Sequence, residues 1–317
     1  MDARARRGPP RDRRLGLAVL ILTVNAGSTS LKLHLVDGDS ARPVDGFERA
    51  DAVGHRVVHG GDRFVAPVRI DDEVEQAIDD LSEIAPLHNT PALKAIREAR
   101  AALPDVPHVA VFDTAFHTTL PDEARTYAIP RAWRDDWGIR RYGFHGLAVE
   151  SVVAQLEAQR IVACHLGGGS SVTAVLYGRS VDTTMGFTPL EGVPMATRSG
   201  SVDPGVLIHL LRQRGLSPDE LDSALEHESG LAALGGLDDP LAFGVYTYRI
   251  AAAVAQMAMA LGGIDVLAFS GGVGENHEDV RDAIAARLAF LGDFEVAVVA
   301  AREELAIARG VREALEG

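Results

Sequence analysis

A stretch near the middle of the chain carries residues well suited to chemistry. Residues 181–204 are rich in Gly, Pro and Thr, which predicts a long loop and not a helix or a strand. Within it, Arg198 stands between Thr197 and Ser199, and a planar guanidinium beside hydroxyls suits a carboxylate or a phosphoryl group. The same stretch offers Asp182, Pro189 and Glu191. An ordered surface loop with an ion-paired arginine fits these residues equally well, so both interpretations stay open.

A second cation lies on a predicted strand. Arg56 and Val58 are two residues apart in the run 52–61, so their side chains share one face. A cation beside a β-branched wall suits a small carboxylate with a short alkyl group. The alternative is an interior strand whose arginine is paired with an acid.

Asp113 and His145 are the next candidates. Asp113 ends the apolar run around residues 109–111, and sites in α/β sheets lie at the carboxyl ends of strands. It could orient a nucleophile or a protonated partner, or it could cap the following turn. His145 lies between Phe144 and Gly146 and is suited to donate to a developing anion, although a single histidine is more often structural.

Two similar strand–turn–strand units occur at residues 19–36 and 161–177. Their turns read Asn25-Ala26-Gly27-Ser28-Thr29-Ser30 and Gly167-Gly168-Gly169-Ser170-Ser171. The backbone N–H groups of such turns can face an anion, Lys32 would support this, and Asn25 could hold a metal or its water. The repetition predicts a duplicated fold with a nucleotide held between two domains.

Two more features stand near the end of the chain. Ser270-Gly271-Gly272-Val273-Gly274-Glu275-Asn276 joins a strand to a helix, where a phosphate or sugar can approach the helix N-terminus. The acid Glu275 distinguishes this turn from a dinucleotide fingerprint. Glu303 and Glu304 open the last helix, and by themselves they fit a helix dipole better than a magnesium site.

The rest of the pattern alternates strands with helices, as in an α/β protein. Helices are predicted at residues 72–82, 91–103, 147–159, 205–214, 217–227, 241–261 and 278–291, and strands at 264–269 and 295–299. Links, loops or turns are predicted at residues 37–51, 85–89, 121–140 and 228–240.

Composition narrows the class of protein. The chain has 317 residues, of which 47% are hydrophobic and 24% charged, as in an ordinary globular protein large enough for two domains. A net charge of −14 argues against nucleic acid or an anionic membrane as the main partner. The single cysteine, Cys164, excludes an internal disulfide and fits a reducing cytoplasm.

The first residues imitate a secretory signal. Six arginines lie within residues 1–14 and an apolar run follows, but that run continues directly into the first strand and turn. We therefore expect residues 1–17 to form a disordered extension. No apolar run is long enough to span a bilayer.

Taken together, these segments resemble the acetate kinase family of acyl phosphate-forming kinases. The resemblance rests on eight collinear motifs: residues 24–32, 54–61 and 86–89; Phe112-Asp113-Thr114-Ala115-Phe116-His117; Arg141-Tyr142-Gly143-Phe144-His145-Gly146; and residues 165–171, 182–204 and 271–276. It implies an α/β fold of two ribonuclease H-like (actin/sugar kinase-type) domains with a cleft between them. The expected domains are 18–115 plus 304–317, which would bind the acid, and 116–303, which would bind nucleotide and form a homodimer.

The resemblance also implies roles for individual residues. Arg56 and Arg198 would grip the acid and the transferring phosphoryl group, His145 would donate to the transition state, and Asp113 would align the carboxylate or Arg56. The acyl pocket would comprise Arg56, Val58, Leu87, Phe144 and Pro189. ATP or ADP would contact Lys32, His165, Gly167, Gly168, Gly169, Ser170, Gly272, Val273, Gly274, Glu275 and Asn276. Asn25 and Glu303 would associate with Mg²⁺ or Mn²⁺.

The chain also departs from the family pattern. Residues 37–53 and 228–264 are shorter than usual, and the second gap removes an Asp and an Arg that normally face adenosine; Asp238 or Asp239 could substitute for that Asp. Acetate is the expected substrate, ahead of propionate. The alternatives are a catalytically weakened homologue that binds nucleotide or carboxylate, and another kinase or hydrolase of the same superfold.

Overall fold

The computed structural model describes residues 19–27, 31–83 and 86–316, without the side chains of residues 83 and 86–88. The predicted extension at residues 1–17 therefore lies outside the described residues. The same holds for the turn residues Ser28, Thr29 and Ser30 and for the side chain of Leu87.

A first sheet of six strands has the order β3-β2-β1-β4-β6-β5. Its strands are β1 (Ile21–Ala26), β2 (Leu31–Asp37), β3 (Ser40–Val44), β4 (Ala52–Val57), β5 (Val68–Arg69) and β6 (His108–Phe112). β1, β2 and β3 pair antiparallel, whereas β4 is parallel to β1 and β6 is parallel to β4. Parallel pairing brings the carboxyl ends of β1, β4 and β6 to one edge, where Asn25, Arg56 and Asp113 lie.

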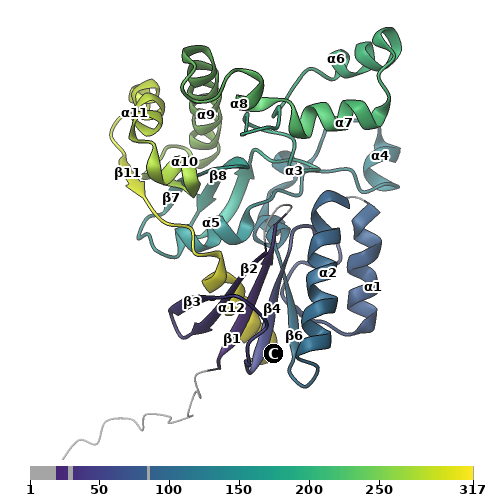
Figure 1. Cartoon of the computed structure of the whole chain (residues 1–317). Helices are drawn as coiled ribbons and strands as arrows, with labels where there is room; N and C mark the ends of the chain where they lie inside the picture. Colours follow the sequence, from purple (N-terminus) through teal and green to yellow (C-terminus); the bar gives the residue numbers. More distant parts are fainter. Residues whose placement is uncertain (1–18, 28–30, 84–85, 317) are drawn as a thin grey trace, which may run out of the picture.

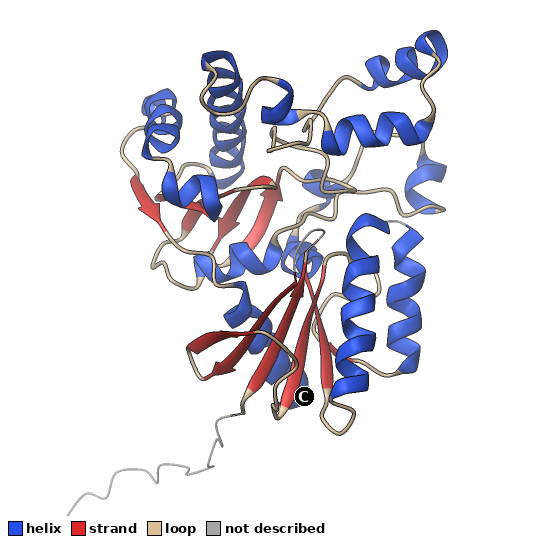
Figure 2. Ribbon diagram, in the orientation of Figure 1, coloured by secondary structure: helices blue, strands red, loops and turns tan. Residues whose placement is uncertain are grey.

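A second sheet repeats this plan in the order β11-β10-β7-β8-β9. Its strands are β7 (Arg160–Leu166), β8 (Ser170–Leu176), β9 (Arg179–Thr183), β10 (Val266–Ser270) and β11 (Glu295–Val298). β7, β8 and β9 pair antiparallel, and β10 and β11 extend the sheet in parallel from β7. The order and directions match those of β1, β2, β3, β4 and β6, so the predicted duplication is confirmed (Figures 1 and 2).

Helices cover both faces of each sheet (Figure 2). On the first sheet, α1 (Asp72–Asp80) and α2 (Pro86–Ala102) pack on one face and α12 (Glu303–Glu316) on the other. On the second, α9 (Pro240–Leu261) and α11 (Glu278–Arg287) pack on one face and α5 (Gly146–Val153) on the other. A Cβ at Gly54 would lie 2.6 Å from Val311 and 2.7 Å from Ile307, so this glycine lets α12 approach the first sheet closely.

Shorter helices complete the chain. They are η1 (Leu81–Glu83), η2 (Asp113–Thr119), α3 (Asp122–Arg125), α4 (Arg131–Asp135), α6 (Pro204–His209), η3 (Leu210–Arg214), α7 (Pro218–His227), α8 (Gly230–Ala233), α10 (Gly271–Asn276) and η4 (Ala289–Leu291). Within the described residues, none of the helices is both long and apolar enough to cross a bilayer.

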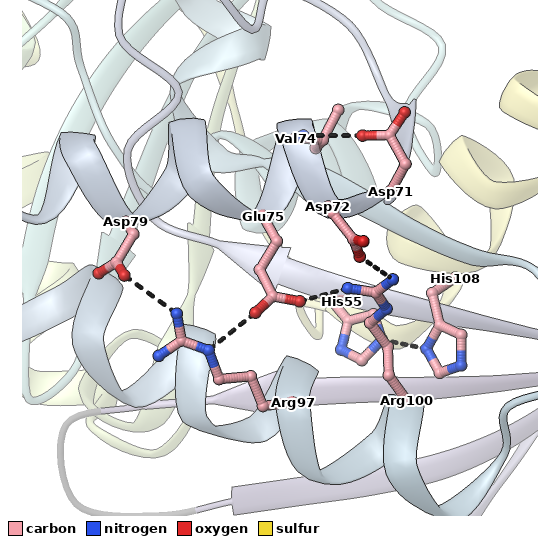
Figure 3. Close-up of polar contacts among 9 residues, drawn as sticks. All are labelled: His55, Asp71, Asp72, Val74, Glu75, Asp79, Arg97, Arg100 and His108. Atoms are coloured by element: carbon pink, nitrogen blue, oxygen red, sulfur yellow. Dashed lines mark hydrogen bonds and ion pairs between the residues drawn. The ribbon is translucent and has the colours of Figure 1, made fainter.

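Ion pairs join α1 to α2 on the outside of the first sheet (Figure 3). Arg97 contacts Glu75 at 2.8 Å and Asp79 at 3.0 Å, and Arg100 contacts Glu75 and Asp72. Because these side chains are partly or largely exposed, each pair contributes little, about 0–1 kcal/mol. They fix the layer of helices that supports β4, the strand that carries Arg56.

Several local predictions were wrong. The loop predicted at residues 85–89 is helical from Pro86, since proline is well tolerated in the first turn of a helix. β3 occupies the predicted link 37–51 because it pairs with β2, and β9 takes residues 181–183 out of the predicted loop. Short helices α3 and α4 lie in the predicted linker 121–140 and α8 in the predicted turn region, while the helix predicted at 147–159 ends at Val153.

Buried histidines should make the fold acid-sensitive. His117 Nε2 donates to the Phe144 carbonyl, its Nδ1 bonds to Ser180 Oγ, and burial lowers its pKa to about 4. The unfolded chain, with a histidine pKa near 6.5, binds the proton first, so stability falls as pH drops from about 6.5 to 4. One such histidine costs up to about 3 kcal/mol at pH 4, and none above pH 7. Urea unfolding of His117→Gln should show a shallower loss over that range than the native chain.

The exposed His227 supplies the control. His227→Gln should keep the acid sensitivity of the native chain. Equal slopes for the native chain and for His117→Gln would contradict the assignment of a neutral buried imidazole.

Candidate active site

A cavity of about 190 Å³ gathers side chains from both halves of the chain. Seven of the predicted site side chains line it, together with three small residues: Ala26, Gly27, Arg56, Val58, Asp113, Phe144, His145, Gly169, Pro189 and Arg198. Segments more than a hundred residues apart thus meet in one hollow, with two guanidinium groups in its wall.

Arg56 lies at the centre of a buried polar network. Its Nε and Nη2 donate to Asp113 Oδ2 at 3.1 and 2.6 Å, and its Nη1 donates to Asn25 Oδ1 at 3.0 Å. Glu303 Oε2 lies 3.8 Å from Nη1 and accepts from Asn25 Nδ2 at 2.6 Å. Burial alone would lower the pKa of Arg56, but Asp113 and Glu303 raise it, so the guanidinium stays charged. Asp113 therefore aligns Arg56 in this geometry.

His145 is held in an uncommon backbone conformation. Its φ of 60° is left-handed, which costs a non-glycine residue of order 1–3 kcal/mol and is typical of functional sites. It precedes α5, which can start there because Gly146 has no side chain: a Cβ would lie 1.9 Å from the Asp113 carbonyl oxygen. Burial, with help from His165, Arg56 and Arg198, holds the pKa of His145 well below its usual range.

The hydrogen bond of the His145 ring to Ser171 is compatible with a proton on Nε2. Nδ1 lies 3.1 Å from Ser171 Oγ, and when that hydroxyl donates, Nε2 carries the proton. Nε2 faces Gly169, whose Cα borders the cavity. A neutral imidazole can thus donate a hydrogen bond into the hollow.

Arg198 has its own carboxylate partner. Its Nε donates to Glu226 Oε2 at 2.6 Å, and both side chains are largely buried. The Thr197 hydroxyl donates to the Glu226 carbonyl at 2.8 Å, so α7 holds the turn around Arg198 as well as its side chain. Arg198 is thus ion-paired, as the surface-loop interpretation expects, and Thr197 beside it is exposed, but the arginine side chain is largely buried and lines the cavity.

The apolar wall of the cavity is small and rigid. Val58 and Phe144 are buried with Tyr142, Met185 and Met195 in one cluster, and Phe187 packs against it. Pro189 completes the wall from the loop side. Since the side chain of Leu87 is not described, its predicted part in this wall remains a prediction.

A larger cavity of about 560 Å³ holds several of the predicted nucleotide-binding residues. It is lined by Asn25, Lys32, His34, His165, Gly167, Gly168, Gly271, Gly272, Glu275, Ala301, Glu303 and Glu304. The two cavities share one turn, because Gly167 and Gly168 line the larger and Gly169 the smaller. Reactants in the two hollows would meet beside this turn.

Five predicted nucleotide contacts do not line this larger cavity: Gly169 lines the smaller one, and Ser170, Val273, Gly274 and Asn276 line neither. Ser170 is buried with its hydroxyl on Tyr246, and Gly274 packs on Phe269. Val273 packs against the core cluster beneath α9, and Asn276 donates to the Gly272 carbonyl.

Asn25 and Glu303 suit a hard divalent cation. Both residues line the larger cavity, and although burial would raise the pKa of Glu303, Arg56, His165 and the Asn25 hydrogen bond lower it, so the carboxylate is ionised. In the described part of the chain, no group of three or more His, Cys, Asp or Glu side chains forms a metal cage.

Sequence reasoning missed Glu226 and His34, and it did not assign a contact to Glu304 or Gly271, although both lie in segments that it singled out. Glu226 has no recognisable signal, because it lies 28 residues after Arg198 within an ordinary amphipathic helix. Lys32 and His34 are two residues apart on β2, so their side chains lie on the same face of the strand. The period-two pattern could therefore have identified His34. Asp239 is one of the two acids that could substitute for the missing Asp near adenosine. In the structure it caps α9, because it accepts hydrogen bonds from the N–H groups of Leu241 and Ala242.

Two paired arginines and a neutral histidine face one hollow, and a glycine-lined cleft with oxygen ligands lies beside it. On two sheets of the same order, this arrangement defines a phosphotransferase of the actin/sugar kinase-like fold.

The profile of the Acetokinase family matches residues 45–307. The chain is 51% identical over 264 residues to an acetate kinase of Clavibacter michiganensis, which covers 76% of this chain and 67% of that relative. A propionate kinase from Francisella tularensis superposes with a TM-score of 0.85 at 30% identity, over 92% of this chain and 98% of the other. An acetate kinase from Porphyromonas gingivalis gives 0.83 at 30% identity, over 94% and 100%. The chain belongs to the acetokinase family, and the predicted fold class is confirmed.

Glu226→Gln tests whether α7 orients Arg198. The amide keeps the size of the side chain but removes its charge, and a charge-assisted hydrogen bond is worth about 1.5–3 kcal/mol. We expect kcat for phosphoryl transfer to fall at least about tenfold, with a smaller change in KM. Steady-state kinetics would measure both, and the exposed Glu228→Gln is the control. An unchanged kcat would show that Glu226 does not orient Arg198 for catalysis.

Proposed function

We propose that the chain transfers the γ-phosphoryl group of ATP to acetate, reversibly, giving acetyl phosphate and ADP. The observation that carries the proposal is the convergence of Arg56, Arg198 and His145 on one small hollow beside the glycine-lined cleft. The 51% identity to an acetate kinase supports the same substrate.

The chemistry follows from the charges. Acetate is already anionic near neutral pH, so a carboxylate oxygen can attack the phosphorus in line without a strong base. Catalysis then rests on positioning and on neutralising the three equatorial oxygens. Arg198 and Arg56 would neutralise them, His145 would donate from Nε2, and Asp113 would keep Arg56 in place.

The larger cleft would hold the nucleotide. The turn 167–169 and the start of α10 offer backbone N–H groups, and Lys32 offers a cation on the opposite side. When bound through Asn25 and Glu303, Mg²⁺, or Mn²⁺ in its place, would offset the charge of the phosphates. Val58, Phe144, Pro189 and Leu87 would enclose the methyl group.

Propionate is the second candidate substrate, and the propionate kinase among the structural neighbours favours it. One methylene discriminates by only about 1–3 kcal/mol, so acetate would be preferred and propionate slower. A weakened, binding-only homologue is the alternative of another class. The arginines and the histidine in one cavity oppose it.

We propose three further properties on less direct grounds. The domains would divide at 18–115 plus 304–317 and at 116–303. The exposed apolar side chains Leu241, Tyr248 and Met259 of α9 would form a homodimer face. The acidic charge and single cysteine favour the cytoplasm, with small molecules as substrates and no nucleic acid or membrane as partner.

A hydroxamate assay with acetate, ATP and Mg²⁺ tests the activity. Acyl phosphate should form with the native chain, and Arg198→Ala should lower kcat at least about 10³-fold, as expected for an arginine that neutralises a phosphoryl transition state. The exposed Arg212→Ala should retain turnover. No acyl phosphate at high protein concentration would favour the binding-only homologue, and near-full turnover of Arg198→Ala would refute the arginine's role.

Val58→Ala tests the acyl wall. Removing two methyl carbons from a wall side chain gives a longer acid more room, so the kcat/KM ratio of propionate to acetate should rise about tenfold. The ratio is measured with both acids in the same assay. Val65→Ala, at an exposed valine away from the cavity, is the control. An unchanged ratio would place the acyl group elsewhere.

A further inference from the structure

The glycine turn at residues 167–169 forms the boundary between the two cavities. Gly167 and Gly168 line the larger one and Gly169 the smaller. A Cβ at Gly169 would lie 3.0 Å from His145 Nε2 and 3.7 Å from Arg198 Nη1. A shift of this turn by a few tenths of an ångström would therefore act first on the phosphate side, which two of its glycines line, and less on the acid side, which one of them lines.

The turn has few anchors of its own. Its glycines carry no side chains, and glycine backbones are conformationally permissive. The Gly167 N–H donates to the Gly169 carbonyl at 2.9 Å and the Ala196 N–H to the Gly168 carbonyl at 3.3 Å. The first side chain after the glycines is that of Ser170, at the start of β8.

Ser170 is tied to the core of the second half of the chain. Its Oγ lies 3.0 Å from Tyr246 Oη, and both residues have no exposed surface. Tyr246 projects from α9 into the cluster that contains Cys164, Leu166 and Val172. Burial raises the pKa of Tyr246 to about 12, so its hydroxyl stays protonated and able to donate.

We propose that the Tyr246 hydroxyl is a positioning residue for the phosphate turn, acting through Ser170, although it touches neither cavity. It fixes the start of β8 against α9, and β8 fixes the turn. The inference rests on the proposed function, because it assigns the nucleotide to the cleft that this turn lines. Within the described residues, neither hydroxyl has another side-chain hydrogen-bond partner. Loss of one hydroxyl therefore leaves the other buried without a partner.

The competing interpretation is that the pair only stabilises the core. The two interpretations differ in a double variant. Removing one hydroxyl leaves the other unsatisfied, whereas removing both leaves a matched apolar contact that can be nearly neutral for stability. A purely structural role predicts that nucleotide binding recovers together with stability, and a positioning role predicts that binding stays weak.

The experiment uses the full chain in six forms: native, Tyr246→Phe, Ser170→Ala, the double variant, Tyr177→Phe and Ile250→Val. Tyr177→Phe makes the same chemical change at an exposed tyrosine just after β8. Ile250→Val, one turn after Tyr246 and buried in the same helix, supplies a core change without a polar group. ADP affinity is measured by calorimetry, KM and kcat with ATP and acetate in the hydroxamate assay, and stability by urea unfolding.

We expect Tyr246→Phe and Ser170→Ala each to weaken ADP binding and raise KM for ATP about five- to tenfold, as one lost buried hydrogen bond implies. KM for acetate should change less than about twofold. The double variant should regain stability but keep the weak ADP binding, and Tyr177→Phe and Ile250→Val should bind ADP as the native chain does.

ADP affinity that follows stability across the set, or that is unchanged in Tyr246→Phe, would overturn the proposal. If the native chain binds ADP but makes no acetyl phosphate, the proposed function fails while the calorimetric comparison still decides the role of Tyr246. A native chain that binds no ADP would overturn both.

Discussion

The site depends on keeping two guanidinium groups charged and oriented in a largely buried hollow. Burying a charge is unfavourable unless it is paired and hydrogen-bonded, so each arginine needs a carboxylate of its own. The pairing must leave part of the guanidinium free for substrate. In Arg198, Glu226 accepts from Nε, and among the described residues neither terminal nitrogen has a carboxylate partner. In Arg56, Asp113 takes Nε and Nη2, while Nη1 is shared between Asn25 and Glu303. Arg198 is therefore the freer of the two, and Arg56 is the more firmly fixed.

The duplicated fold provides this arrangement. The first sheet brings Asn25, Arg56 and Asp113 to one edge through parallel pairing of β1, β4 and β6. The second sheet supplies the turn after β7 and the loop after β9 that carries Arg198. α5 begins between them, where the missing side chain of Gly146 lets His145 sit against Asp113. The site is thus a property of how the two halves meet, and α12 adds Glu303 from the end of the chain.

The sequence predicted the parts of the site that short motifs carry. Arg56, Asp113, His145 and Arg198 each lie in a compact run with turn or strand character, and the structure brings them into one cavity. What the sequence could not predict are partners that act across distance. Glu226 is one acid among several on an amphipathic helix, and Tyr246 is one of two tyrosines on an almost wholly apolar one. Ser170 was expected to face nucleotide, but its side chain points into the core, because the direction of a residue after a turn depends on strand register. The helix predicted at 91–103 was found as α2, but its first turn, from Pro86, was missed. Strand β3 was missed because pairing with β2 outweighed a weak local signal.

The connection before α9 bears on how a nucleotide site would bind the base, whereas other segments would bind the phosphates. Asp239 Oδ1 accepts from two N–H groups at the start of α9, so this acid has a structural role as a helix cap. The groups proposed to face the phosphates come from β2, the turn after β7 and α10, none of which lies in that connection. Transition-state stabilisation depends on the phosphoryl end of ATP, whereas contacts to the base contribute mainly uniform binding. Shortening this part of the chain is therefore expected to affect which base is preferred, and how tightly, before it affects the transfer step itself.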